Sequence, residues 1–173
     1  MANNLITDAG TVSTIELADG SHAQRVVVID DVFTITPTLD TSAYAVGDTL
    51  FAATEINDVA LQSGKPVTLV SVCLIDKDDQ KFGMVLHFFD RSVTFGTANA
   101  APSISDADAA NLVGQIFISA TDWIDLGGVA TLQANFSPIK MKPNATDLYV
   151  AATTLGTPTH TSAGLSLKLG FDR

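Results

Sequence analysis

The sequence predicts an all-β fold, an antiparallel two-sheet sandwich of the jelly-roll type with about eight to ten short strands and one short helix. Apolar and polar residues alternate with a period of two in several segments, and turn-forming residues interrupt those segments about every 8–12 residues. Charged residues make up only 16% of the chain, below the roughly 25% usual for soluble domains. Small or β-branched polar residues such as threonine stand in their place, which favours strands over amphipathic helices.

The clearest predicted strand is 165–171, in which leucines and Phe171 alternate with Ser166, Lys168 and Gly170. That alternation is typical of a strand with one buried face. The other segments with strand character are 12–17, 25–29, 32–36, 49–53, 115–120, 130–136 and 148–152. Short stretches rich in Gly, Asp or Pro separate them, as turns between strands require.

One segment departs from this pattern and predicts a helix. Ser105 is followed three residues later by Asp108, which approximates a capping box at a helix start. Good helix formers follow, and Gly114 can supply the left-handed residue that ends a helix. We therefore expect about two turns of helix over 106–113.

The segments 67–75 and 82–89 are apolar on both faces and are joined by the polar stretch 76–81, which predicts a β-hairpin. A sheet of a sandwich usually has one wet face, so the second apolar face needs a cover. Leaving three such side chains in water would cost on the order of 1.5–3 kcal/mol each. The cover is either the short helix and loop 90–104 or another protein subunit. The candidates for a subunit or capsid interface are Val70, Val72, Leu74, Val85, His87 and Phe89.

The chain of 173 residues fits one domain and shows no linker rich in Gly or Pro. We expect residues 1–20 to form an N-terminal arm or an edge strand that is available for docking. Residues 21–173 are then the single sandwich domain.

The formal net charge of −10 excludes several classes of partner. It repels phosphate backbones, so we expect no direct binding to nucleic acid.

No run approaches 18 consecutive apolar residues, so we expect no membrane span. The N-terminus does not match a signal peptide, and the single cysteine, Cys73, lies in an apolar run and cannot form an intrachain disulfide. We expect a cytoplasm-like compartment during synthesis.

Motifs for chemistry are weak. Neither His22, His87 nor His160 belongs to a recognised ligand pattern, and His160 is expected in an exposed loop. The stretch 76–79 resembles the start of a calcium loop, but the sixth and twelfth positions are Lys81 and His87 instead of glycine and glutamate. No Gly-x-Ser-x-Gly elbow or phosphate-binding glycine loop occurs. We therefore predict no enzyme, no catalytic residue, no metal and no cofactor.

Trp123 is the only tryptophan, and phenylalanines outnumber tyrosines nine to two. This ratio favours aromatic rings in the core or at an interface over a wet recognition surface. An alternative interpretation is a carbohydrate-binding module, in which Trp123, Tyr44 and Tyr149 would stack on sugar rings.

Several segments of the sequence resemble segments of structural proteins of tailed bacteriophages. They are 36–51, Leu74-Ile-Asp-Lys-Asp-Asp-Gln80, Leu86-His-Phe-Phe-Asp90, Asn99, 103–111, Tyr149-Val-Ala151 and 157–171. Together they cover most of the chain after about residue 22, and similar proteins include head decoration, or cement, proteins.

The resemblance implies a location in the virion, on the outer head surface after assembly in the bacterial cytoplasm. It implies binding to the major capsid protein and self-association, with a trimer expected because three-fold symmetry closes the contacts. It supplies no catalytic residues. A tail, baseplate or head-fibre component remains an alternative, although the long repeats or heptads usual in fibres are missing.

Overall fold

The computed structural model describes residues 5–7, 10–12, 14–16, 22–24 and 30–173. Two short antiparallel pairs come first, β1 (Leu5–Thr7) with β2 (Gly10–Val12), and β3 (Thr14–Glu16) with β4 (His22–Gln24). The predicted strand 25–29 lies outside the described residues, and the predicted boundary at residue 20 stays a prediction.

The remaining elements are short. They are β5 (Asp30–Ile35), β6 (Thr49–Ile56), β7 (Val67–Asp76), β8 (Met84–Phe89), α1 (Asp106–Ala109), β9 (Leu112–Ile118), the 3-10 turn η1 (Ala120–Asp122), β10 (Ile124–Asp125), β11 (Ala130–Gln133), β12 (Ile139–Met141), β13 (Leu148–Thr154) and β14 (Leu165–Asp172). The strands predicted at 32–36, 49–53, 115–120, 130–136, 148–152 and 165–171 are confirmed, with shifted ends.

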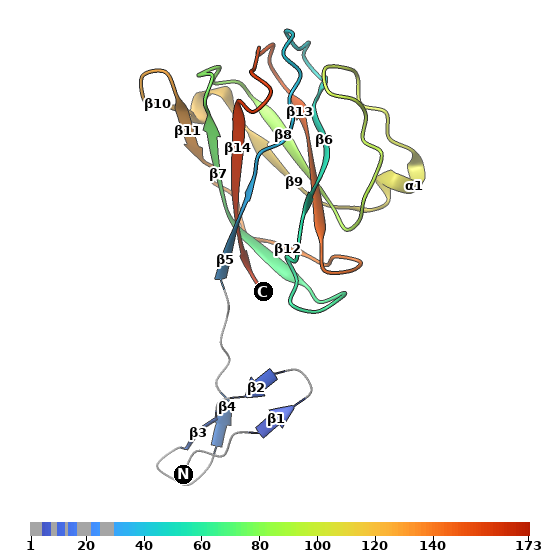
Figure 1. Cartoon of the computed structure of the whole chain (residues 1–173), viewed down its shortest axis with the longest axis vertical. Helices are drawn as coiled ribbons and strands as arrows, with labels where there is room; N and C mark the ends of the chain where they lie inside the picture. Colours follow the sequence, from blue (N-terminus) through green and yellow to red (C-terminus); the bar gives the residue numbers. More distant parts are fainter. Residues whose placement is uncertain (1–4, 8–9, 13, 17–21, 25–29) are drawn as a thin grey trace.

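These strands form two antiparallel sheets that face each other (Figure 1). The first sheet has the order β10-β11-β7-β14-β5, with β12 also paired to β7, and the second has the order β6-β13-β8-β9. The first strands of the sandwich pair with the last in reverse order: β5 with β14, β6 with β13, β7 with β11 and β8 with β9. Pairing of β14 with β7 and of β13 with β8 then rolls this ribbon into two layers. This winding is a jelly roll, so the predicted fold class is confirmed.

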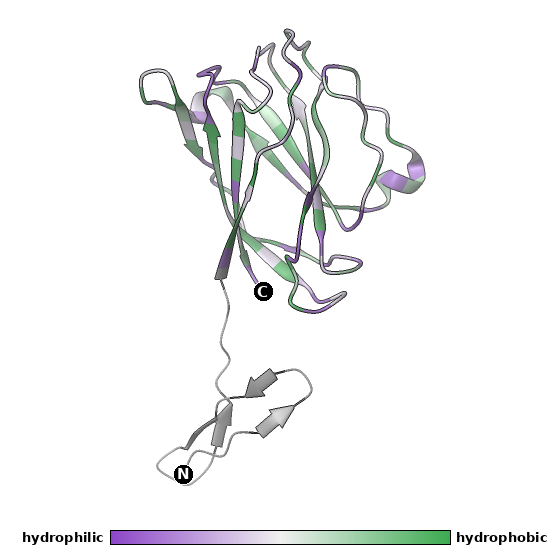
Figure 2. Cartoon of the chain, in the orientation of Figure 1, coloured by the Kyte–Doolittle hydropathy of each residue, from purple (hydrophilic) through white to green (hydrophobic). Residues whose placement is uncertain are grey.

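The core lies between the inner faces of the two sheets. Its fully buried side chains include Leu74, Leu169 and Phe171 from the first sheet and Phe51 and Phe88 from the second. Apolar residues gather along the strands, whereas α1 is polar (Figure 2). Burial of these faces drives the two sheets together.

The predicted hairpin of 67–75 and 82–89 is wrong, because β7 and β8 belong to different sheets. At the end of β7 the Asp76 carboxylate accepts backbone N–H groups of Asp78, Gln80 and Lys81, at 3.1, 2.7 and 2.9 Å. These hydrogen bonds shape a connection that leaves the first sheet and crosses to the second. Alternation identifies a strand, but it does not identify the strand's partner.

A bulge in β7 changes which of its side chains face the core. The register with β14 shifts between Gly170, opposite Ser71, and Phe171, opposite Leu69, so Val70 has no partner there. Leu69 before the bulge and Leu74 after it are therefore both buried in the main core, although strict alternation would place them on opposite faces. Val70 is left 38% exposed.

The helix is shorter than the predicted 106–113. The Ser105 Oγ accepts the Asp108 N–H at 3.1 Å, as the capping signal indicates, but α1 ends at Ala109. Gly114 lies inside β9, where a β-carbon would come within 3.2 Å of Ile139 on β12. Within the described residues, no helix is long and apolar enough to span a membrane.

Candidate interaction face and histidine–aspartate cluster

The outer face of the second sheet is apolar along β8. Met84, Leu86 and Phe88 of this strand pack into the main core, whereas Phe89 belongs to a second cluster on the opposite face. The second cluster joins Phe89, Phe95 and Ala151, with Ala53, Val93, Ile104 and Tyr149 at its margin. β8 therefore carries two apolar faces, as its sequence indicates.

The cover of this outer face is the chain's own segment 90–111. The Phe95 ring centroid lies 5.1 Å from that of His87 and 5.8 Å from that of Phe89. Backbone hydrogen bonds fix the segment along the start of β6: Thr49 donates to the Ala100 carbonyl at 2.8 Å, and Asn99 donates to the Thr49 carbonyl at 2.9 Å. Of the two covers left open by the sequence, the intrachain one is present, so the apolarity of 82–89 does not itself require a partner.

His87 is held at the border of this cover. Gln115 Nε2 lies 2.9 Å from His87 Nδ1, and Thr153 Oγ1 lies 3.1 Å from His87 Nε2. Because the amide nitrogen can only donate, Nδ1 accepts and Nε2 carries the proton. Burial lowers the pKa of His87, which keeps the ring neutral at neutral pH.

A cavity of about 280 Å³ lies between this sheet and the covering segment. Its lining includes His87, Phe95, Pro102, Ile104, Leu112 and Gln115. The surface is mainly apolar with a few polar groups at one side, which is a lining suited to an apolar side chain rather than to a charged ligand.

Beyond the cover, the outer face stays open at β9. Phe117 of this edge strand pairs with Val85 of β8 and is 73% exposed. Leu155, directly after β13, packs beside Gly83 and is 48% exposed. An exposed aromatic side chain on an edge strand marks a surface suited to protein contacts.

The six predicted interface residues do not form one surface. Val72 and Leu74 are fully buried in the main core, and Val85 and Phe89 are buried on the other sheet. Val70 is the most exposed of the six, and it lies on the first sheet. Their role in an interface stays a prediction, and the exposed Phe117 of β9 is not among them.

The three predicted sugar-stacking residues are also separated. Trp123 is 8% exposed, stacks on Phe82 and donates its Nε1–H to the Phe82 carbonyl at 2.8 Å. Tyr44 is 2% exposed and donates to the Leu50 carbonyl at 3.0 Å. Only Tyr149 is partly exposed, and it donates to Glu55. Trp123 and Tyr44 thus present no ring face to a sugar. Trp123 lies in the core, which is one of the two positions, core or interface, that its sequence indicates.

A cluster of ionisable groups joins the end of β7 to the connection between β13 and β14. His160 Nδ1 lies 3.4 Å from Asp78 Oδ2 and 3.9 Å from Asp76 Oδ1. His160 and Asp76 are buried, so the expected exposed position of His160 is wrong. Burial raises the pKa of Asp78, but the hydrogen bonds that Thr161 donates to its carboxylate and the electrostatic effect of the nearby His160 ring outweigh burial, so the pKa lies below its ordinary value.

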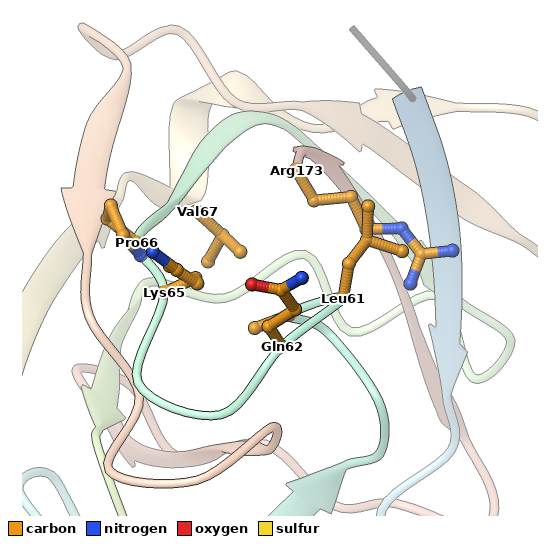
Figure 3. A pocket seen from close by; sticks show the side chains of 7 residues that line it. Leu61, Gln62, Lys65, Pro66, Val67 and Arg173 are labelled. Carbon is orange, nitrogen blue, oxygen red and sulfur yellow. The ribbon is translucent and has the colours of Figure 1, made fainter. Parts of the chain in front are cut away.

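A larger pocket, of about 400 Å³, lies between the 60–67 segment and the C-terminus (Figure 3). The Arg173 side chain extends toward β5, where it pairs with Asp31. It also donates to the Asp58 carbonyl, in the segment after β6, at 2.7 Å. Its guanidinium also lies 5.4 Å from the Phe33 ring centroid. The Arg173 charge thus ties the C-terminus to the first sheet, and among the described residues no cluster of titratable groups lines the pocket.

No protein-family model matches this chain, and a search of curated proteins finds no match. Among solved structures, the chain is similar to VP2 in the subviral particle of infectious bursal disease virus, with 13% identity and a TM-score of 0.39 over 96% of this chain and 39% of that one. A chain in the structure of the Gt strain of that virus gives 15% identity and a TM-score of 0.37 over 95% and 40%. The chain thus spans about two fifths of these proteins, and TM-scores this low do not define a shared family or function.

Proposed function

We propose that this chain is a structural protein of a tailed-bacteriophage virion, most specifically a decoration or cement protein on the outer head surface. The proposal starts from the phrases distributed over 36–51 and 157–171 that resemble phage structural proteins. The jelly roll is compatible with it, since viral capsid proteins use this fold, but lectins and cupins do as well. The fold alone therefore does not support one function over another.

The single observation that carries the proposal is the exposed ring of Phe117 on the edge strand β9. An uncovered edge strand with a large aromatic side chain exposes the protein to aggregation unless a partner covers it. The proposed partner contact is centred on this edge, with the major capsid protein or a second copy of the chain packing on it. A trimer would bury three such edges in closed contacts.

The negative charge fits this position. A net charge of −10 disfavours contact with packaged DNA and favours an outward location. A small contact per copy is sufficient there, because a lattice that offers many equivalent sites, together with a trimeric binder, multiplies weak contacts through avidity.

Quantitative protein analysis of purified virions tests the location. A cement role predicts a copy number comparable to that of the major capsid protein, with density on the outer head surface by cryo-electron microscopy. A few copies at one vertex would instead support the tail, baseplate or head-fibre alternative. Absence from the particle would overturn the virion role altogether.

Binding of purified chain to heads that lack it tests the surface. Phe117→Asp is expected to abolish head binding, because it places a charge in the apolar contact. Val46→Asp is the matched control, since Val46 is 66% exposed in the turn before β6, away from β9, and it should bind like the unmodified chain. Equal binding by both variants would contradict an interface at β9.

A further inference from the structure

We propose that Asp76, Asp78 and His160 form a binding site for one divalent transition-metal ion of the Zn²⁺ type. The proposed ligand atoms are His160 Nδ1, Asp78 Oδ2 and Asp76 Oδ1, because these make the close nitrogen–oxygen contacts of the cluster. Each of the three residues offers one ligand atom within 4.8 Å of those of the other two. The site would join the end of β7 to the connection between β13 and β14. It does not depend on the proposed virion role.

The state of His160 is the first reason. Its side chain has no exposed surface, and neither ring nitrogen makes a hydrogen bond to any part of the chain that the structure describes. The rings of Phe82 and Tyr44 lie at centroid distances of 4.9 and 6.4 Å. A buried imidazole with two unsatisfied nitrogens is costly, and a metal ion on Nδ1 would satisfy the nitrogen that faces the carboxylates.

The distances are the second reason. A charge-assisted hydrogen bond between imidazolium and carboxylate is about 2.7–2.9 Å long, whereas the nitrogen–oxygen separations here are 3.4 and 3.9 Å. Ligand atoms about 2.0–2.2 Å from a tetrahedral zinc ion are separated from each other by about 3.3–3.6 Å. Both separations are thus longer than a direct hydrogen bond between imidazolium and carboxylate, and the one to Asp78 falls in the range expected for two ligands of one metal ion.

The charge balance is the third reason. Two carboxylates converge here, and the Asp76 side chain has no exposed surface. The neighbouring cations are directed elsewhere: Lys77 Nζ donates to the Ala163 carbonyl at 3.1 Å, and Lys81 Nζ pairs with Asp79 and Asp125 at 3.2 and 2.6 Å. A divalent cation would neutralise the two carboxylates where these lysines do not.

The surrounding hydrogen bonds orient the carboxylates toward His160. Asp76 Oδ2 accepts the Gln80 and Lys81 N–H groups, and Oδ1, which accepts the Asp78 N–H at 3.1 Å, lies 3.9 Å from His160 Nδ1. The Thr161 N–H donates to Asp78 Oδ2 at 2.8 Å, and the Thr161 hydroxyl lies 3.1 Å from Oδ1 and 3.0 Å from Oδ2. At Gly164 a β-carbon would lie 1.8 Å from Asp78 Oδ2, so only glycine leaves room for this carboxylate. Such outer partners fix the geometry of metal ligands.

The ligand set defines the class of metal. One imidazole and two carboxylates suit Zn²⁺ and similar transition-metal ions, whereas Ca²⁺ and Mg²⁺ prefer sites made of oxygen atoms. Water would complete the tetrahedron, and Asp78, with 18% of its side chain exposed, marks the side from which the ion enters.

Isothermal titration calorimetry on the full chain after treatment with a chelator tests the site. We expect one Zn²⁺ per chain and at least roughly tenfold weaker binding of Ca²⁺. His160→Gln and Asp78→Asn should each weaken Zn²⁺ binding by more than about tenfold. His87→Gln is the matched control, because it removes another half-buried histidine outside the cluster, and it should bind Zn²⁺ like the unmodified chain.

A second measurement needs no substitution in the cluster and remains decisive if the variants fail to fold. In the unmodified chain, NMR of the histidine ring nitrogens should show a large shift of one Nδ1 resonance on addition of one equivalent of Zn²⁺. The resonance should persist in the His87→Gln chain. Lack of a Zn²⁺-dependent ring shift, or undiminished Zn²⁺ binding by a folded His160→Gln chain, would overturn the proposal.

Discussion

The strands β7 and β8 are both rich in apolar residues on their two faces, but these residues are buried in different ways. In β7 a bulge at Val70 changes the phase of the alternation, so that most of its apolar side chains enter one core. β8 follows a regular alternation against β13 and keeps two apolar faces, of which the outer one is covered by segment 90–111. A two-sided apolar strand therefore need not indicate a partner subunit, because either a bulge or a covering loop is sufficient.

The largest expected effect is the difference in stability loss between substitutions at inward and at outward positions of β7. Leu74→Ala removes a fully buried side chain and should lower the free energy of unfolding by about 3–5 kcal/mol. Val70→Ala, at the bulge, should lower it by less than about 1 kcal/mol. Denaturant unfolding measures both. Similar losses for the two variants would show that the bulge does not set the phase of this strand.

The next effect concerns the cover of β8. Phe95→Ala should lower the free energy of unfolding by about 2–3 kcal/mol, less than Leu74→Ala, because segment 90–111 can open locally while the main core stays intact. Hydrogen exchange should accelerate at Asn99 and Ser103, whose N–H groups hold the segment in place. Phe117→Ala is the matched control on the same sheet, and its exposed ring predicts a change within about 0.5 kcal/mol. Unchanged exchange in Phe95→Ala would show that the ring is not the anchor.

A smaller effect tests the close contact beside the bulge. A β-carbon on Gly170 would lie 2.3 Å from Ser71 Oγ, so Gly170→Ala should destabilise the fold by about 1–2 kcal/mol. Ser71→Ala removes that oxygen and should recover part of the loss in the double variant. A double-mutant cycle measures this coupling, and strictly additive losses would rule out the contact as the cause.

The smallest expected effect concerns the pKa values of two tyrosines, one from each apolar cluster. The hydrogen bond to Glu55 raises the pKa of Tyr149 to about 12 from the ordinary 10.0, and burial raises the pKa of Tyr44. Because both folded-state values are raised, the neutral phenols favour the folded state below pH 10, and for Tyr149 this contribution is lost as the pH rises to about 12. An ultraviolet titration should show no phenolate midpoint at 10 in the folded chain. Glu55→Gln should lower the titration midpoint of Tyr149 and leave that of Tyr44 in place. If both midpoints shift together, the hydrogen bond to Glu55 is not the specific cause of the raised Tyr149 pKa.

The strands were predictable to the extent that their signals are local. The alternation of leucines in 165–171 and the capping serine before α1 depend on neighbours a few residues away, and both were identified. The pairing of β7 and β8 and the length of α1 depend on contacts with distant segments, and both were predicted wrongly. Among the proposed sites, Phe117 and His160 had no local signal, because the neighbouring sequence does not show whether a phenylalanine or a histidine is exposed or buried.

The sequence by itself determined the fold class, because a period of two in hydrophobicity and frequent turn residues are compatible only with short strands that bury one face. Tertiary structure alone decided which strands pair, that segment 90–111 covers β8, and that His160 meets Asp76 and Asp78. The physical reason is that a two-residue period defines faces but carries no information on distant partners, which are selected by the burial of all the faces together.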